Sequence, residues 1–441
     1  MMNSLTFDLS KKEDSFKVLN AINGGPCHRR HGIGQNRSTL EDYKALRIPY
    51  NRNHDANHHG FYGGPFAHDI SAIFKDFNAD PYSPESYEFD CTDEALAISI
   101  EAGTKVFYRL GESIELHITK HHTLPPKDFE KWAIICEHII RHYTEGWANG
   151  FYYDIEYWEI WNEPDLNEEK PHARTTWGGT RGQFFDMYEI TAKHLKKCFP
   201  HLKIGGPAVS SRMHWMEDFL YEMDKRKAPL DFISWHSYCK EPKRMIEKAG
   251  TVNELLQKYH FDYVERILNE WNYIKGWANE EFIYSIEAIH GIKGATFILS
   301  CMSEVQRTDL VDMLMYYDAT PSIWNSLFDF YTFKKLKGYY AFLWSGMMCG
   351  NQYAINADNS VENVYTLCGV DENDKVMAVI TYYSDDDTLE NKKVSVDFGR
   401  KGKYEIYVLD NEHDAEFVGL TDALEFDMKL HSAILIKEIE E

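Results

Sequence analysis

The chain has 441 residues, 44% of them hydrophobic and 27% charged, which is an ordinary composition for a globular protein and enough length for one large domain with a smaller module. Its formal net charge of −23 disfavours nucleic acids and anionic membrane surfaces as partners, because both are bound through Lys and Arg. Aromatic residues make up 15% of the chain, a share that suits a large core and the stacking of sugar rings equally.

The eight cysteines include no CxxC pair, so the sequence predicts free thiols and no zinc site. The first residues, MMNSLTFDLSKKEDSFK, lack the apolar stretch of a secretory signal, and no long apolar run predicts a membrane span. These features favour a cytoplasmic protein without a membrane partner. They are compatible with a monomer and with a homo-oligomer.

A repeated alternation organises most of the chain: a short apolar strand, a polar loop and then a segment with helical periodicity. This pattern is typical of βα units around a parallel sheet, and eight such strands close a (β/α)8 TIM barrel. We expect this barrel to cover residues 18–345. Its predicted strands are residues 18–23, 45–50, 105–110, 157–161, 203–206, 231–235, 266–269 and 295–300.

Two amphipathic stretches, residues 128–143 and 183–198, predict helices that pack on the barrel. The segment 51–86 is rich in Gly, Pro, His and Asn. It is too long for a plain connection, so we expect it to fold over the barrel mouth.

The pattern changes after the barrel. Residues 346–441 show short alternating stretches, such as KVMAVITYY and KYEIYVLD, separated by turn clusters. This predicts a smaller C-terminal antiparallel β-sandwich domain. A strand from residues 1–17 can join it, because chain ends often meet in space. The predicted fold class is therefore α/β, a TIM barrel with a β-sandwich.

Asn162-Glu163-Pro164 ends the fourth predicted strand, in YWEIWNEPD. Side chains at the C-terminal ends of barrel strands face the active site. Glycosidic cleavage needs a carboxylic acid beside the leaving oxygen, and the neighbouring aromatic side chains disfavour the charged form of Glu163. We therefore expect Glu163 to donate a proton and Asn162 to bind a substrate hydroxyl. The alternative is an ordinary strand-ending acid.

Glu270 ends the seventh predicted strand, in RILNEWN. The fourth and seventh strands of one barrel would place the two carboxylates across the mouth from each other. A retaining glycosidase needs its two carboxyl groups about 5–5.5 Å apart. We expect Glu270 to be the nucleophile and Glu163 the acid/base. The alternative for Glu270 is a salt-bridged acid at a strand end.

His236 and Tyr238 follow the sixth predicted strand, in DFISWHSYC, next to the strand of Glu270. A Tyr hydroxyl in this position can donate to the nucleophile and stabilise its ionised form. His236 can bind a sugar hydroxyl or orient a neighbour. Core or surface positions are the alternatives for both.

Two further side chains are candidate substrate contacts, each with a structural alternative. Arg109 ends the third predicted strand and can anchor a carboxylate, either Glu112 or a substrate acid, or form a buried pair that shapes the mouth. Trp177 follows the fourth strand and suits a stacking platform or a structural cap.

The sequence predicts no metal and no cofactor. HGIGQNR contains Gly32-x-Gly34, but Arg37 stands where a dinucleotide-binding fingerprint requires its third Gly. Four histidines lack the helical His-x-x-x-His spacing of a zinc site, so we expect them to be solvated in a loop. They are His54, His58, His59 and His68.

The chain resembles glycoside hydrolase family 39, within a large clan of retaining enzymes that carry their catalytic glutamates on strands four and seven. The matching motifs are WNEP (Trp161 to Pro164), WHSY (Trp235 to Tyr238) and NEW (Asn269 to Trp271). The resemblance implies Glu163 as acid/base and Glu270 as nucleophile, with His236 and Tyr238 lining the −1 sugar subsite. Trp271 joins the candidate substrate contacts.

One segment departs from the family pattern. Xylosidases and iduronidases of the family usually show an Arg-Phe-His segment on the second strand, whereas the corresponding region here is ALRIPYNRNHDANHH. Asn53-His54-Asp55 can serve in its place, which makes His54 and Asp55 candidate substrate contacts.

We therefore predict a retaining glycosidase that acts on small oligosaccharides or glycosides, with a small carbohydrate as its partner. Two alternatives stay open: a transglycosylase, in which a sugar acceptor intercepts the glycosyl-enzyme, and a non-catalytic carbohydrate-binding barrel protein. The sugar, the anomer and the linkage also stay open.

Overall fold

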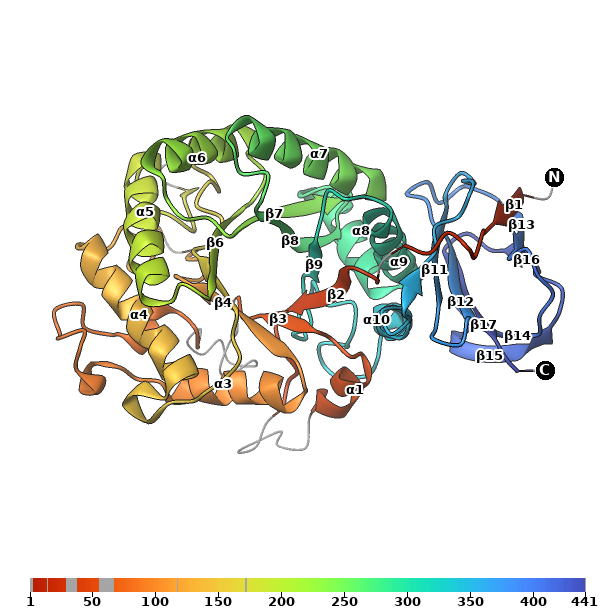
Figure 1. Ribbon diagram of the computed structural model, residues 1–441, viewed down its shortest axis with the longest axis horizontal. Helices are drawn as coiled ribbons and strands as arrows, with labels where there is room; N and C mark the ends of the chain where they lie inside the picture. The colour runs from red at the N-terminus through yellow and green to blue at the C-terminus, as the bar shows by residue number, and fades with distance from the viewer. Residues whose placement is uncertain are drawn as a thin grey trace.

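The structure is a computed structural model that describes residues 3–13, 15–28, 38–54, 67–116, 118–170 and 173–440. A closed barrel lies beside a two-sheet β-sandwich, and helices surround the barrel (Figure 1). Within the described residues, no helix combines the length and the apolar character that a membrane crossing requires. All eight cysteines are free thiols.

Eight described strands close the barrel in chain order, and each is parallel to its neighbours, as the fold prediction requires. They are β2 (Val18–Asn23), β3 (Tyr50–Arg52), β4 (Lys105–Leu110), β5 (Tyr157–Ile160), β6 (Lys203–Val209), β7 (Phe232–Cys239), β8 (Glu265–Tyr273) and β9 (Met313–Tyr316).

Two of the predicted strands were wrong. Residues 45–50 contain the end of a short helix and a turn, and only Tyr50 belongs to β3. Residues 295–300 lie inside α9 (Ile292–Gln306), and the eighth strand is β9 instead. Helix α9 lies between the barrel and the sandwich and is buried on nearly every side. A helix that is apolar all round has no hydrophobic period that would distinguish it from a buried strand.

Helices lie outside the strands (Figure 1). The predicted helix 128–143 corresponds to α4, where Asp128 accepts a hydrogen bond from Lys131 N at 3.0 Å and Gly146 ends the helix with φ 74°. The predicted helix 183–198 corresponds to α5. The helices are α1 (Leu40–Ala45), α2 (Ile70–Ile73), α3 (Asp90–Glu101), α4 (Phe129–Glu145), α5 (Arg181–Cys198), α6 (Met213–Arg226), α7 (Pro242–Lys258), α8 (Asn279–His290), α9 and α10 (Lys337–Met348), with 3₁₀ turns η1 (Pro84–Ser86) and η2 (Trp147–Asn149).

The barrel interior has two layers, because side chains two residues apart on a strand point the same way. The lower layer is apolar and includes Ala21, Phe107, Tyr157, Phe232 and Ile267. The next inward-facing residues on the same strands are polar and buried, and they are Asn23, Arg109, Glu159, Ser234 and Asn269. The fold therefore places a polar floor beneath the C-terminal mouth of the barrel.

The sandwich contains two described sheets. One is three-stranded in the order β1-β13-β16, and the other is six-stranded in the order β10-β11-β12-β17-β14-β15. The N-terminal strand β1 pairs in parallel with β13, with Asn3 opposite Val394. The strands are β1 (Asn3–Thr6), β10 (Tyr353–Ala354), β11 (Val364–Val370), β12 (Val376–Tyr382), β13 (Lys392–Asp397), β14 (Tyr404–Leu409), β15 (Asp414–Thr421), β16 (Glu425–Met428) and β17 (Ser432–Glu438).

Strands β12 and β17 are buried on both faces. Ala378 and Ile436 pack in the sandwich core, whereas Val379 and Leu435 pack with the core of the barrel. The two modules therefore share a hydrophobic interface. The boundary predicted between residues 345 and 346 falls inside α10.

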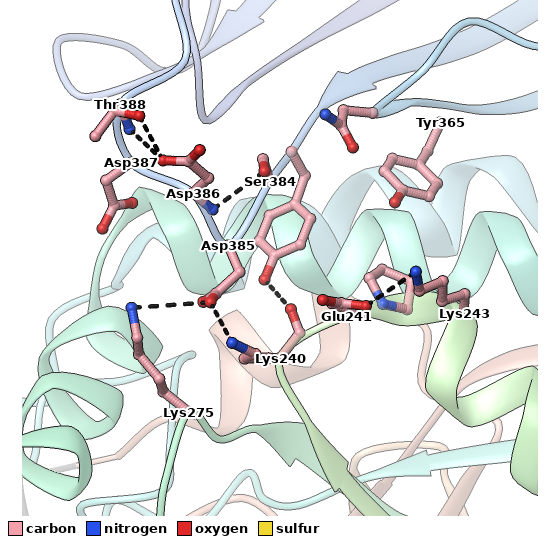
Figure 2. Close-up of a pocket in the computed structure, with 13 residues that line it drawn as sticks. Lys240, Glu241, Lys243, Lys275, Tyr365, Ser384, Asp385, Asp386, Asp387 and Thr388 are labelled. Carbon is pink, nitrogen blue, oxygen red and sulfur yellow. Dashed lines mark hydrogen bonds and ion pairs between the residues drawn. The ribbon is translucent and has the colours of Figure 1, made fainter.

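The loop after β12 binds the barrel through Asp385 (Figure 2). Figure 2 shows its carboxylate beside Lys240 and Lys275, whose Nζ atoms lie 3.1 Å and 3.8 Å away. Outside that view, the same carboxylate accepts a hydrogen bond from Tyr273 Oη at 2.6 Å. Buried Lys293 of α9 lies 3.4 Å from the same carboxylate. Because Lys240 directly follows β7 and Tyr273 ends β8, this sandwich loop contacts the C-terminal ends of both strands.

Candidate active site

Glu163 and Glu270 lie close together at the mouth of the barrel. His236 Nδ1 is 2.7 Å from Glu163 Oε1 and 3.2 Å from Glu270 Oε2. One imidazole nitrogen of His236 and one carboxylate oxygen from each glutamate all lie within 4.8 Å of one another. The fold thus unites two acids that the sequence placed on different strands, at a spacing compatible with the roughly 5–5.5 Å of a retaining site.

The backbone that presents Glu163 is unusual. Trp161 and Glu163 both have positive φ values, 74° and 47°, although neither is glycine. Such conformations cost roughly 1–2 kcal/mol per residue and are concentrated at functional sites. Glu163 N donates to Ala208 O at 3.0 Å and holds the turn against β6. A Cβ at Gly111 would lie 3.1 Å from the Trp161 Cα atom, so glycine is needed there.

A β-bulge brings Glu270 into the mouth. In the pairing of β7 with β8, Trp235 lies opposite Leu268 and His236 lies opposite Glu270. Residue 269 therefore has no partner on β7. The extra residue lets consecutive side chains turn inward: Asn269 contacts Glu159 in the barrel interior, and Glu270 contacts His236.

Arg52 and Tyr238 both donate hydrogen bonds to the carboxylate of Glu270, a buried residue. Arg52 Nη1 donates to Oε1 at 2.9 Å, and Tyr238 Oη donates to Oε2 at 3.0 Å. Burial, with the charge of Glu270, raises the pKa of Tyr238 well above its usual value, so the phenol keeps the proton that it donates. Both contacts favour the ionised form of Glu270.

Arg52 is the main site residue that the sequence analysis missed. It ends β3 and is fully buried. Besides Glu270, it donates to Glu159 Oε2 at 2.7 Å, to Asn162 Oδ1 at 2.6 Å and to Asn23 Oδ1 at 3.0 Å. The guanidinium of Arg52 on β3 therefore connects this strand to β2, β5 and β8 around the barrel mouth. The available signal was its position one residue before Asn53, at the end of the stretch IPYNR.

Glu159 forms the base of this network. It is fully buried and accepts hydrogen bonds from Ser234 Oγ at 2.6 Å and Asn269 Nδ2 at 2.7 Å. Together with Arg52 it forms an ion pair with no exposed surface on either side chain. Such pairs are costly to break, because the remaining charge is left buried without a partner.

His236 is an uncharged group between the two acids. Burial lowers its pKa to about 4. Because Nδ1 faces two carboxylates, we assign its single ring proton to Nδ1. Lys248 Nζ donates to the His236 carbonyl oxygen at 2.5 Å and helps to fix this part of β7.

Arg109 and His54 also lie in the upper barrel. Arg109 Nη2 pairs with Asp69 Oδ1 at 2.9 Å, so its ion-pair partner is an acid other than the expected Glu112, and its contact with a substrate acid stays a prediction. Glu112 instead accepts hydrogen bonds from Ser71. His54 Nε2 lies 3.7 Å from Glu270 Oε1.

Two tryptophans proposed as substrate contacts belong to the core. Trp177 is 2% exposed and packs edge-on against Trp161 at 5.1 Å, which corresponds to the structural cap and excludes an open stacking face. Trp271 is fully buried and packs against Tyr316 and against Phe297 of α9. The residue after Glu270 points away from the barrel interior because neighbouring residues of a strand alternate in direction.

The loop histidines differ from the prediction of a solvated group. His54 and His68 are buried, and burial lowers the pKa of His68 to about 3. His58, His59 and the candidate contact Asp55 lie outside the described residues, as does the centre of the segment expected to cover the mouth.

The Glu163, His236 and Glu270 side chains also offer a set of oxygen and nitrogen atoms that a divalent metal could use. Arg52, a permanent cation, lies against Glu270 and would compete with a metal for its charge. Two acids beside an uncharged imidazole instead form an arrangement suited to proton transfer and nucleophilic attack.

Comparisons with known proteins give a family match over much of the chain. The model of a family described as Glycosyl hydrolases family 39 matches residues 56–287, more than half of the chain. A beta-xylosidase from Geobacillus stearothermophilus is 29% identical over 174 residues, which cover 35% of this chain and 33% of the relative. The match therefore spans about a third of that curated relative.

Solved structures share the whole fold. A glucosidase from Croceicoccus marinus superposes with a TM-score of 0.80 at 19% identity, covering 100% of this chain and 99% of the other. A GH39 beta-xylosidase from Caulobacter crescentus gives a TM-score of 0.69 at 14% identity, covering 99% and 100%. At these identities the likeness concerns the fold.

Proposed function

Because the chain belongs to the glycosyl hydrolases family 39, we propose that it cleaves glycosidic bonds with retention of configuration, using Glu270 as nucleophile and Glu163 as acid/base. The observation that carries this proposal is the single imidazole nitrogen within 3.2 Å of both carboxylates. One carboxylate oxygen of each glutamate lies within 4.8 Å of the other. This spacing is closer to the roughly 5–5.5 Å of retaining enzymes than to the roughly 6.5–9.5 Å of inverting ones, which supports direct attack by Glu270.

The surroundings of the two acids support the assignment of roles. Glu270 accepts hydrogen bonds from Arg52 and Tyr238, which keep it ionised and oriented. Glu163 contacts an uncharged His236, and its side chain is 16% exposed against 7% for Glu270. Glu163 can therefore carry a proton and exchange it with solvent.

The reaction proceeds in two displacements. The Glu270 carboxylate attacks the anomeric carbon, the bond to the leaving oxygen breaks, and that oxygen takes the proton of Glu163. A covalent glycosyl ester of Glu270 results. Glu163, now ionised, takes a proton from water, the water oxygen attacks the anomeric carbon, and the ester bond breaks. Two inversions give net retention.

We propose an uncharged sugar, with β-xylosides as the first class to test. Arg52, the cation that lies against the nucleophile, is already paired with Glu159 and Glu270, so it has little charge to offer a uronic acid. The relatives include proteins named beta-xylosidase. Small glycosides and oligosaccharides as substrates, and a cytoplasmic location, stay predictions.

The test is a hydrolysis screen with aryl β-xyloside, α-L-arabinosides, β-galactoside, β-glucoside and α-L-iduronide, with proton NMR of the first anomer released. Release with retained configuration supports the double displacement and identifies the sugar. Inversion would remove Glu270 as nucleophile. Sugar binding without release would favour the non-catalytic alternative, and new oligosaccharides formed with excess acceptor would favour the transglycosylase.

A further inference from the structure

Three aromatic rings form a cluster beside the nucleophile. Tyr238 contacts Trp277 at 5.3 Å and Trp324 at 5.9 Å between ring centroids, and the two indoles are 5.8 Å apart. Trp277 is 61% exposed, although it is a large apolar side chain. An exposed indole that packs against a residue hydrogen-bonded to the proposed nucleophile is a candidate binding surface.

The contacts of Tyr238 locate this cluster relative to the reacting atoms. Its hydroxyl donates to Glu270 Oε2 at 3.0 Å, and its ring packs against Trp277 in a T-shaped arrangement with an interplanar angle of 69°. Trp277 is therefore separated from the nucleophile by one side chain and lies on the solvent side of it.

The loop that carries Trp277 is held in place at several points between β8 and α8. Ile274 N donates to the carbonyl of the last residue of β7 at 3.0 Å, and Lys275 N donates to Ser285 Oγ at 2.9 Å. A Cβ at Gly276 would lie 2.8 Å from Glu281 Cβ, so glycine lets the loop pack against the first turn of α8. The indole is thus presented by a fixed backbone, which limits the entropy lost on binding.

We infer that Trp277 is a platform for the leaving group of the substrate, which stacks a flat face on the exposed indole. This inference rests on the proposed function. The sugar that reacts must lie between Glu163 and Glu270, and any part of the substrate that extends toward solvent past Tyr238 meets Trp277. The C–H face of a second pyranose ring and the face of an aryl aglycone both fit this chemistry.

The experiment compares three substrates that share one glycone and differ only in the leaving group: a methyl glycoside, a phenyl glycoside and a disaccharide. The methyl group is too small to stack. We expect Trp277→Ala to lower kcat/KM about three- to tenfold for the phenyl glycoside and the disaccharide, with less than about a twofold change for the methyl glycoside. Trp277→Phe should restore most of the loss.

The matched control is Tyr263→Ala, another exposed aromatic residue (71%), which lies two residues before the start of β8 at the opposite end of the strand. It should leave all three values unchanged. A loss confined to the phenyl glycoside or to the disaccharide identifies which leaving group the platform takes. Equal losses for all three substrates, or none, would overturn the inference while the proposed function stands. Failure of the unaltered protein to release any sugar would overturn the proposed function itself.

Discussion

The surroundings of Glu163 and Glu270 differ in kind. Glu270 is held by a permanent cation and a phenol, and its backbone lies on a bulged strand. Glu163 stands on a turn with positive φ and contacts an uncharged imidazole. The same nitrogen of His236 reaches both acids. The difference teaches how neighbours can distinguish two chemically identical acids for the proposed roles of nucleophile and proton donor.

The largest effect is expected from removal of the proposed nucleophile. Glu270→Ala should lower kcat on the order of 10⁴-fold or more, because no glycosyl-enzyme can form. Added azide should restore part of the activity by direct attack, and NMR should show a glycosyl azide of inverted configuration. A glycosyl azide of retained configuration from this variant would contradict the assignment of Glu270 as nucleophile.

Glu163→Ala should show a loss that depends on the leaving group. Poor leaving groups need a proton, so their hydrolysis should fall roughly 10²- to 10⁴-fold, whereas formation of the glycosyl-enzyme from a dinitrophenyl glycoside should change little. Azide should here give a product of retained configuration, since it attacks the glycosyl-enzyme. Pre-steady-state kinetics with both substrate types measure the contrast. A uniform loss with every leaving group would mean that Glu163 is not the acid.

Arg52→Lys should reduce kcat/KM by about 10- to 100-fold, because one ammonium cannot reproduce the contacts of the guanidinium with Glu159, Asn162 and Glu270. The acid limb of the pH–rate profile should move to higher pH, since weaker cationic support makes Glu270 harder to ionise. The control is Arg266→Lys, which alters another arginine–carboxylate pair, with Asp312, at the start of β8. An unmoved acid limb would show that Arg52 does not control the charge of Glu270.

The smallest expected effect is on the pH dependence of protein stability, through the imidazole of His236. The pKa of His236 is lowered by burial to about 4 in the folded protein, against about 6.5 for an unfolded histidine. Between these values the unfolded chain binds a proton that the folded one does not, so stability falls as the pH drops from 6.5 toward 4. His236→Asn should reduce this loss by about 2 kcal/mol between pH 6.5 and 4.5 in urea unfolding. An unchanged pH dependence would indicate a charged imidazole between the acids.

Much of the barrel could be predicted because its strands are short apolar segments with a clear position in a βα repeat. Glu163, Glu270, His236 and Tyr238 were accessible because each stands at or just beyond such a segment. Arg52 was not, since β3 has three residues and the apolar stretch before it is a turn. The direction of Trp271 depends on a bulge, and no local pattern in the sequence marks it.

Burial by parts of the chain that are distant in sequence also limited what the sequence could predict. The apolar run in α9 was assigned to a strand because the sandwich covers the side of the helix that would otherwise face water. Trp177 follows the Asn162-Glu163-Pro164 motif, as a substrate contact would, yet it packs against Trp161. Burial from a second module and from loops is a tertiary property that no single window of sequence contains.

The pairing of β1 with β13 has a consequence for how the chain matures on the ribosome. Asn3 Nδ2 donates to the Lys393 carbonyl oxygen, so the first described strand must wait for a partner that is synthesised 390 residues later. At typical translation rates of about 5–20 residues per second, this delay is roughly 20–80 s. The barrel segments can pair with one another as they emerge, whereas the small sheet closes only after β13 appears. During that interval β1 is an unpaired edge, and its shortness limits the risk of aggregation.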